Sequence, residues 1–179
     1  MAIIQIYKEM ATKKQILKFM LIMKMMTLVV FPSVSFAKAQ PILVRYSGKV
    51  VVQAEDKTKT WYIDPIKKEK YSLNNAKDAL VIMQNLGIGI SNKDINRIKL
   101  PTSKYSNWKD YIFAKNISGR IFVQVQDKGQ AWYIDSINYR KYYLGTADNA
   151  LKVLKSLSIK AKVSDINQIK TDLISTKIQ

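Results

Sequence analysis

Hydrophobic and polar positions follow two different periods along the chain, and the change of period marks the expected elements. Segments 49–54 and 60–64 are rich in β-branched and aromatic residues, and the polar turn between them is typical of a β-hairpin. A third short strand is expected over 70–73. Apolar residues then recur at helical spacing from Ala76 to Leu86, with Gly87 as the stop.

The second half of the chain repeats this pattern. Gly48 to Lys99 aligns without a gap on Gly119 to Lys170, at an offset of 71 residues, and 23 of the 52 pairs are identical. In each copy a second short helix follows the longer one, beginning near Ser91 or Ser164. The sequence therefore predicts an α+β fold of two tandem repeats. Each repeat has a β-hairpin and a third short strand packed against one longer and one short helix.

Alternation along the hairpin strands predicts which side chains form the core. In segment 60–64, Trp61 and Ile63 share one face of the strand, while Tyr62 and Asp64 share the other. We expect the tryptophan face to pack under the longer helix. Over both copies, the predicted core comprises Trp61, Ile63, Leu73, Leu80, Trp132, Ile134, Leu144 and Leu151.

The opposite face carries tyrosines and has two interpretations. It is either an outward aromatic platform, which suits sugar rings or nucleobases, or a packing surface between the modules. The candidate ligand-binding residues are Tyr62, Tyr71, Tyr133, Tyr142 and Tyr143.

The first 39 residues have the pattern of an export signal. Basic residues at Lys13, Lys14 and Lys18 precede an apolar run, and small residues end it, so cleavage is expected after Ala39 or Ala37. A lysine and a proline interrupt the run, which favours a cleaved signal over a retained membrane anchor.

The remaining boundaries follow from the repeat. The first module is expected over 40–99, the second over 119–170, and a tail over 171–179. Segment 100–118 contains Trp108, Tyr111 and Phe113, so it is expected to pack against the modules, with an edge strand as one interpretation of 111–115.

The amino-acid composition excludes several classes of catalytic and metal-binding site. The chain has no cysteine and no histidine, which removes thiol nucleophiles, disulfides, the usual zinc sites and imidazole catalysis. Asp64 and Asp135 recur in the repeat, but a turn or cap role explains them as well as paired-carboxylate catalysis does. No calcium-loop, phosphate-loop or nucleophile-elbow motif occurs. We therefore predict a noncatalytic protein with no metal and no cofactor.

The motifs around Trp132-Tyr133-Ile134-Asp135 and Tyr142-Tyr143-Leu144-Gly145 resemble an uncharacterised tandem-repeat module of predicted secreted proteins from candidate-phyla-radiation (Parcubacteria-like) bacteria. The resemblance covers both copies and implies a surface-associated module without known catalytic residues. The first copy departs from it, with Tyr71-Ser72-Leu73-Asn74 in place of the second motif.

The net charge is +17, which favours anionic partners, although a lysine-rich composition alone can produce it. The first hypothesis is an exported bacterial protein of the cell surface or envelope that binds an anionic wall polymer or glycan through a basic, tyrosine-bearing surface. The alternatives are a structural or protein-interaction module of a surface assembly, and extracellular nucleic-acid binding.

Overall fold

The computed structural model describes residues 9, 12–13, 15 and 41–172. Residues 41–172 belong to one compact unit. Apart from the four isolated positions, the predicted export signal with its cleavage sites at Ala37 and Ala39 lies outside the described residues, as does most of the predicted tail. In the part of the chain that is described, no helix has the length and apolar character needed to cross a membrane.

The elements of the first half are α2 (Ile42–Tyr46), β1 (Val50–Gln53), β2 (Thr60–Ile63), β3 (Lys70–Ser72), α3 (Ala76–Leu86), β4 (Ile88–Ile90) and α4 (Asn92–Arg97). Those of the second half are α5 (Trp108–Ile117), β5 (Ile121–Gln124), β6 (Ala131–Ile134), β7 (Lys141–Tyr143), α6 (Ala147–Ser156), β8 (Ile159–Ala161) and α7 (Val163–Ile166). The two halves thus have the same order of elements, and the α+β prediction is confirmed.

Each of the two four-stranded sheets takes three strands from one half and the fourth from the other. The first sheet has the order β3-β2-β1-β8, and the second has the order β4-β5-β6-β7. Strands β8 and β4 pair in parallel with β1 and β5, while all the other pairs are antiparallel. The expectation that each module builds its own sheet is therefore corrected, because helices α3 and α6 each lead into a strand of the opposite sheet.

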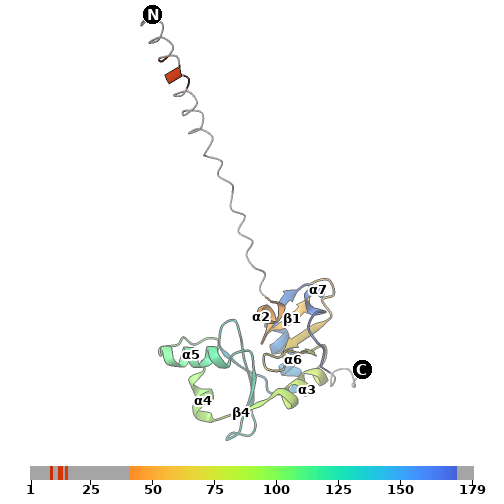
Figure 1. Cartoon of the computed structure of the whole chain (residues 1–179). Helices are drawn as coiled ribbons and strands as arrows, with labels where there is room; N and C mark the ends of the chain where they lie inside the picture. Colours follow the sequence, from red (N-terminus) through yellow and green to blue (C-terminus); the bar gives the residue numbers. More distant parts are fainter. Residues whose placement is uncertain (1–8, 10–11, 14, 16–40, 173–179) are drawn as a thin grey trace, which may run out of the picture. The chain divides into compact units, whose positions relative to one another are not determined.

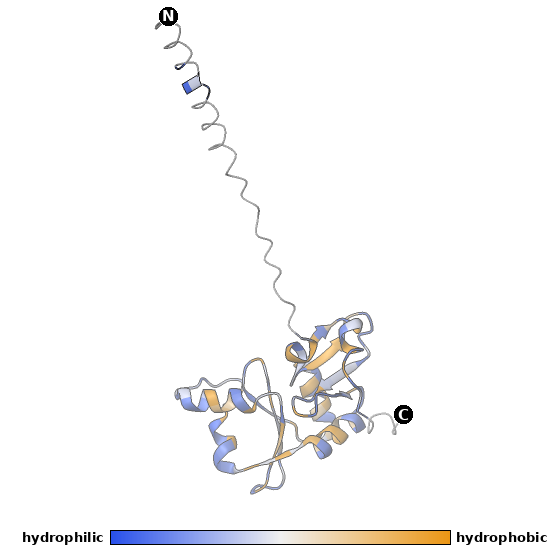
Figure 2. Cartoon of the chain, in the orientation of Figure 1, coloured by the Kyte–Doolittle hydropathy of each residue, from blue (hydrophilic) through white to orange (hydrophobic). Residues whose placement is uncertain are grey.

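We call the sheet with β1, together with α2 and α7, the first lobe, and the sheet with β5, together with α4 and α5, the second lobe (Figure 1). One buried cluster contains α3, α6 and the facing residues of both sheets, so it joins the lobes. A second cluster packs α2 and α7 on the other face of the first sheet, and a third packs α4 and α5 on the other face of the second. Figure 2 shows hydrophobic residues on the strands and on α3, with polar residues in the connecting turns.

The two halves touch backbone to backbone at two glycines. A Cβ added to Gly48 would lie 2.6 Å from the Cα of Gly119, and the reverse is equally true. Both glycines have positive φ, at 68° and 78°, a region that other residues adopt at a cost. Tyr62 donates a hydrogen bond to the carbonyl of Gly119, and Tyr133 donates one to the carbonyl of Gly48, each at 2.6 Å. This junction requires glycine at both positions.

Local signals in the sequence placed the start and the end of α3 and the start of α4 correctly. The Asn75 side chain accepts from the amide of Asp78 at the start of α3, and Gly87 follows the last helical residue. At α4, the Ser91 side chain accepts from the amide of Asp94. In the second copy α7 starts at Val163 rather than near Ser164, and no side chain caps it. The edge strand considered for 111–115 is wrong, because this segment belongs to helix α5.

Candidate functional site: a cationic pocket in the first lobe

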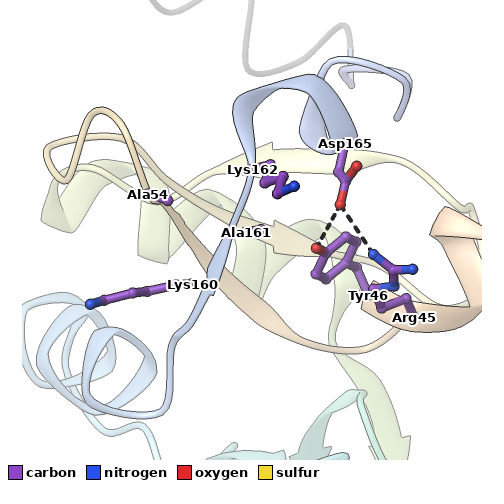
Figure 3. A pocket seen from close by; sticks show the side chains of 7 residues that line it. All are labelled: Arg45, Tyr46, Ala54, Lys160, Ala161, Lys162 and Asp165. Atoms are coloured by element: carbon purple, nitrogen blue, oxygen red, sulfur yellow. Dashed lines mark hydrogen bonds and ion pairs between the residues drawn. The ribbon is translucent and has the colours of Figure 1, made fainter.

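A pocket of about 340 Å³ opens in the first lobe where α2, β8 and α7 meet (Figure 3). Its volume lies at the lower end of the range for small-ligand sites. It is lined by Arg45, Tyr46, Ala54, Lys160, Ala161, Lys162 and Asp165. Three of these seven residues are cations, and one is an acid.

The single carboxylate of the lining, Asp165, is already engaged by two neighbours from α2. Tyr46 donates a hydrogen bond to Asp165 Oδ2 at 2.9 Å, and Arg45 Nη1 lies 3.3 Å from the same oxygen. Burial, and then the hydrogen bond to Asp165, raises the pKa of Tyr46, so its hydroxyl stays protonated as a donor. These contacts tie α2 to α7, although the two helices are more than 100 residues apart in the sequence.

The two lysines of the pocket are less engaged in contacts within the fold. Lys160 and Lys162 are exposed, and Figure 3 shows Lys160 extending from β8 away from Asp165. The nearby Glu55 accepts a hydrogen bond from the backbone amide of Val163 at 3.0 Å. Because Arg45 pairs with Asp165, and Glu55 accepts from a backbone amide, the excess positive charge that the pocket offers a ligand comes from the two lysines.

The pocket is specific to the first lobe, as the matching positions of the second lobe show. At the repeat offset, Arg45 and Tyr46 correspond to Asn116 and Ile117, which have no charge. Lys160 and Lys162 correspond to Gly89 and Ser91, and only the acid at Asp165 is retained, as Asp94. The second lobe therefore folds with no cation at the positions of Lys160 and Lys162, whereas Arg45 also has a structural contact in the first lobe, its ion pair with Asp165.

The expected tyrosine platform lies mostly inside the protein. Tyr62, Tyr71 and Tyr133 are buried, with at most 1% of each exposed, so their assignment to an outward ligand-binding face is wrong. The rings of Tyr62 and Tyr133 meet edge to face at 6.3 Å in the cluster that joins the lobes. The reason is that both faces of each sheet are covered, with α3 and α6 on the tyrosine face.

The other two candidate tyrosines lie nearer the surface. Tyr142 is half-buried, and its hydroxyl accepts a hydrogen bond from Asn138 Nδ2 at 2.8 Å. Tyr143 is 48% exposed and packs against Trp132, with ring centroids 5.2 Å apart. The predicted ligand-binding residues therefore do not come together as one surface.

The predicted core residues take three kinds of position. Ile63, Leu73, Ile134 and Leu144 are buried. Trp61, Trp132 and Leu151 are partly buried against the core clusters. Leu80 is 41% exposed, so the prediction that it belongs to the core is wrong. The buried stripe of α3 runs instead through Ala79, Ile82, Met83 and Leu86.

The recurring acids Asp64 and Asp135 both accept hydrogen bonds in turns, which agrees with the first of their two interpretations, a turn or cap role. Asp64 Oδ2 accepts from the amide of Lys67 at 2.6 Å, and Asp135 Oδ2 accepts from the amide of Asn138 at 3.1 Å. Burial raises the pKa of Asp135, while hydrogen bonds from the turn amides oppose that rise. Among the described residues, no group of three or more aspartate or glutamate side chains could hold a metal ion.

Two buried lysines support the lobes from within. Lys70 donates to the carbonyl of Ile166 at 2.8 Å, and Lys141 donates to that of Ile95 at 2.9 Å. Burial lowers the pKa of both ammonium groups, and the charge of Lys99 contributes at Lys141. Because both lysines bind a helix carbonyl in matching positions, we assign them a structural role.

The pocket residues were not predicted from the sequence because the candidate residues were chosen among positions that the two copies share. The cations at Lys160 and Lys162 fall inside the aligned range, opposite Gly89 and Ser91. A search for differences between the copies would have found them. Arg45 lies before the aligned range and carried no such signal.

No protein-family model, curated protein or solved structure matches this chain. The resemblance to a secreted tandem-repeat module thus stays a prediction.

Proposed function

We propose that this chain is an exported, noncatalytic protein that binds an anionic polymer of the bacterial cell envelope, with the cationic pocket of the first lobe holding its negatively charged groups. The observation that carries the proposal is that Arg45, Lys160 and Lys162 all line one pocket, whose only carboxylate is engaged by Arg45 and Tyr46. The matching positions of the second lobe lack all three cations.

The chemistry of the pocket favours charged groups spaced along a chain. A guanidinium binds carboxylate or phosphate oxygens through two parallel hydrogen bonds, and lysine ammonium groups add mobile point charges. The pocket is open, and its lysines are exposed, so a polymer could pass through without burying its ends. The net charge of +17 adds a long-range attraction toward such a polymer.

The proposal is tested by binding of the chain from residue 40 onwards to purified bacterial cell wall. We expect retention that salt releases, because at about 0.1 M salt exposed charges are screened beyond roughly 10 Å. Replacing Arg45, Lys160 and Lys162 together by glutamine should weaken binding by about tenfold.

The matched control replaces three exposed lysines that do not line the pocket, Lys77, Lys93 and Lys115, by glutamine. Both variants lose the same charge, so the control separates a pocket from a general basic surface. Equal losses in the two variants, or retention that salt does not change, would contradict the proposal. Recovery of one specific protein partner in place of wall polymer would favour a protein-interaction module.

A further inference from the structure

The second lobe carries a cluster of tyrosines that is distinct from the buried pair at the junction. Tyr105 precedes α5, Tyr111 lies within α5, and Tyr139 lies in the turn between β6 and β7. The ring centroids of Tyr105 and Tyr111 are 5.7 Å apart, and those of Tyr111 and Tyr139 are 5.5 Å apart, with both pairs edge to face. Two segments that are distant in sequence, 105–111 and the turn at Tyr139, thus bring their rings together.

Polar contacts hold these rings in place. The hydroxyl of Tyr105 donates to the carbonyl of Tyr139 at 2.6 Å and accepts from the amide of Lys99 at 3.4 Å. The guanidinium of Arg140 lies over the ring of Tyr105, 4.4 Å from its centroid. A ligand that stacks here would meet an aromatic surface that is already ordered, which lowers the entropic cost of binding.

Part of this aromatic region remains open to solvent. Trp108 is 70% exposed and Tyr111 is 37% exposed. They are three residues apart on α5, so their side chains are neighbours on one side of the helix. Ile137, in the same turn as Tyr139, is also exposed. Folding therefore leaves most of the Trp108 side chain and part of the Tyr111 side chain uncovered.

The first lobe has the same turn without the aromatic ring. Tyr139 and Arg140 correspond to Lys68 and Glu69 at the repeat offset. Lys68 has φ of 58° and Tyr139 has φ of 60°, so the turn adopts one backbone conformation with either side chain. Glu69 instead forms an ion pair with Lys170 at 2.6 Å. The tyrosine and the arginine are therefore not needed to build the turn.

We propose that Trp108, Tyr111 and Tyr139, which we call the aromatic surface, form a second binding site that takes the sugar rings of a glycan. The C–H face of a pyranose ring packs on an aromatic face, and its hydroxyls bond to polar groups at the rim. Here the tyrosine hydroxyls supply those polar groups, while Arg140 lies against the ring of Tyr105 with its Nη1 buried. The site is independent of the cationic pocket, since it uses different elements of the other lobe.

The size of the aromatic surface favours a glycan over a protein partner. A stable protein interface involves about 20–30 residues on each side, whereas the aromatic surface comprises three side chains, so a small ring-shaped ligand fits it better than a protein does. The two lobes would then present different chemistry on one frame, with charge in the first and aromatic stacking in the second.

The test uses the chain from residue 40 onwards on an array of neutral oligosaccharides, followed by titration of the best-retained sugar with tryptophan fluorescence as the readout. Trp108 is far more exposed than Trp61 and Trp132, which are both partly buried, so stacking on it should change the emission. We expect Trp108→Ala and Tyr111→Ala each to weaken binding by about tenfold.

Val125→Ala is the matched control, because Val125 is an equally exposed apolar residue of the second lobe, at 69%, outside the aromatic surface. It should bind the sugar like the unmodified chain, as should the variant that replaces the three pocket cations. Far-UV circular dichroism checks that each variant is folded. Retention of no sugar on the array, or unchanged affinity in both aromatic variants, would overturn the proposal. Tighter binding of a single-stranded oligonucleotide at the same residues would also overturn it.

Discussion

Gly119 offers the sharpest test of how the two halves are joined, because two separate costs act there when a Cβ is added. The first is conformational, since φ is 78° and a left-handed backbone costs a non-glycine residue roughly 1–2 kcal/mol. The second is steric, because the new Cβ would lie 2.6 Å from the Cα of Gly48. That atom belongs to a backbone whose amide donates to the carbonyl of Ile63 at 2.8 Å, so it cannot move away freely.

The chain contains a control that isolates the first cost. Gly129 has φ of 68°, but a Cβ placed there meets nothing closer than a Val123 methyl group at 3.9 Å. Gly129→Ala should therefore lower the free energy of unfolding by about 1–2 kcal/mol. Gly119→Ala should lower it by about 2–5 kcal/mol, because overpacking adds roughly 1–3 kcal/mol.

Urea denaturation of the chain from residue 40, followed by far-UV circular dichroism, measures both changes. Gly48→Ala should resemble Gly119→Ala, since the contact is reciprocal. If Gly119→Ala and Gly129→Ala destabilise the chain equally, the close contact between the halves does not contribute to stability and the reasoning fails.

Three further predictions concern the shared core. Tyr62→Phe removes the donor to the carbonyl of Gly119 and leaves that carbonyl without this buried hydrogen bond, so urea denaturation should show a loss of about 1–3 kcal/mol. Burial raises the pKa of Tyr62 and Tyr133. The unfolded chain therefore releases their protons first, and stability that is present below about pH 10 should fall above it by up to about 1.4 kcal/mol per pH unit per tyrosine; a pH-independent urea midpoint up to pH 11 would refute this. Leu154→Ala, at a fully buried position, should cost about 2–5 kcal/mol, whereas Leu80→Ala, at a 41% exposed position, should cost under about 1 kcal/mol in the same assay; similar costs would refute the assigned stripe.

Local structure was predictable because its signals lie within a few residues of each other. The β-branched content of Lys49 to Ala54 predicted the strand that the structure places at Val50–Gln53. Asn75 and Ser91 predicted helix starts because a side-chain oxygen accepts from an amide three residues ahead. The strand at Ile88–Ile90 was not predicted, because a three-residue run interrupted by a glycine has no period of its own. It becomes a strand only by pairing with β5 in the other half.

The location of the candidate site, like the strand β4, depends on contacts between the two halves of the chain. Alternation correctly separates Tyr62 from Ile63, but it does not say whether one face of a sheet or both are covered. The exchange of β4 and β8 carries α3 and α6 between the sheets and buries the tyrosine face. The same exchange brings Lys160 of the second half to Arg45 of the first half in one pocket.

The sequence by itself thus determined the class of fold, the strands β1–β3 and β5–β7, and the helices α3 and α6, because propensity, capping and periodicity act over short separations. The tertiary structure alone decided which strands pair, which tyrosines are buried, and which cations line the same pocket. These outcomes depend on contacts between residues far apart in the chain, such as Arg45 with Asp165 or Tyr62 with Gly119. Local sequence patterns carry no information about such long-range contacts.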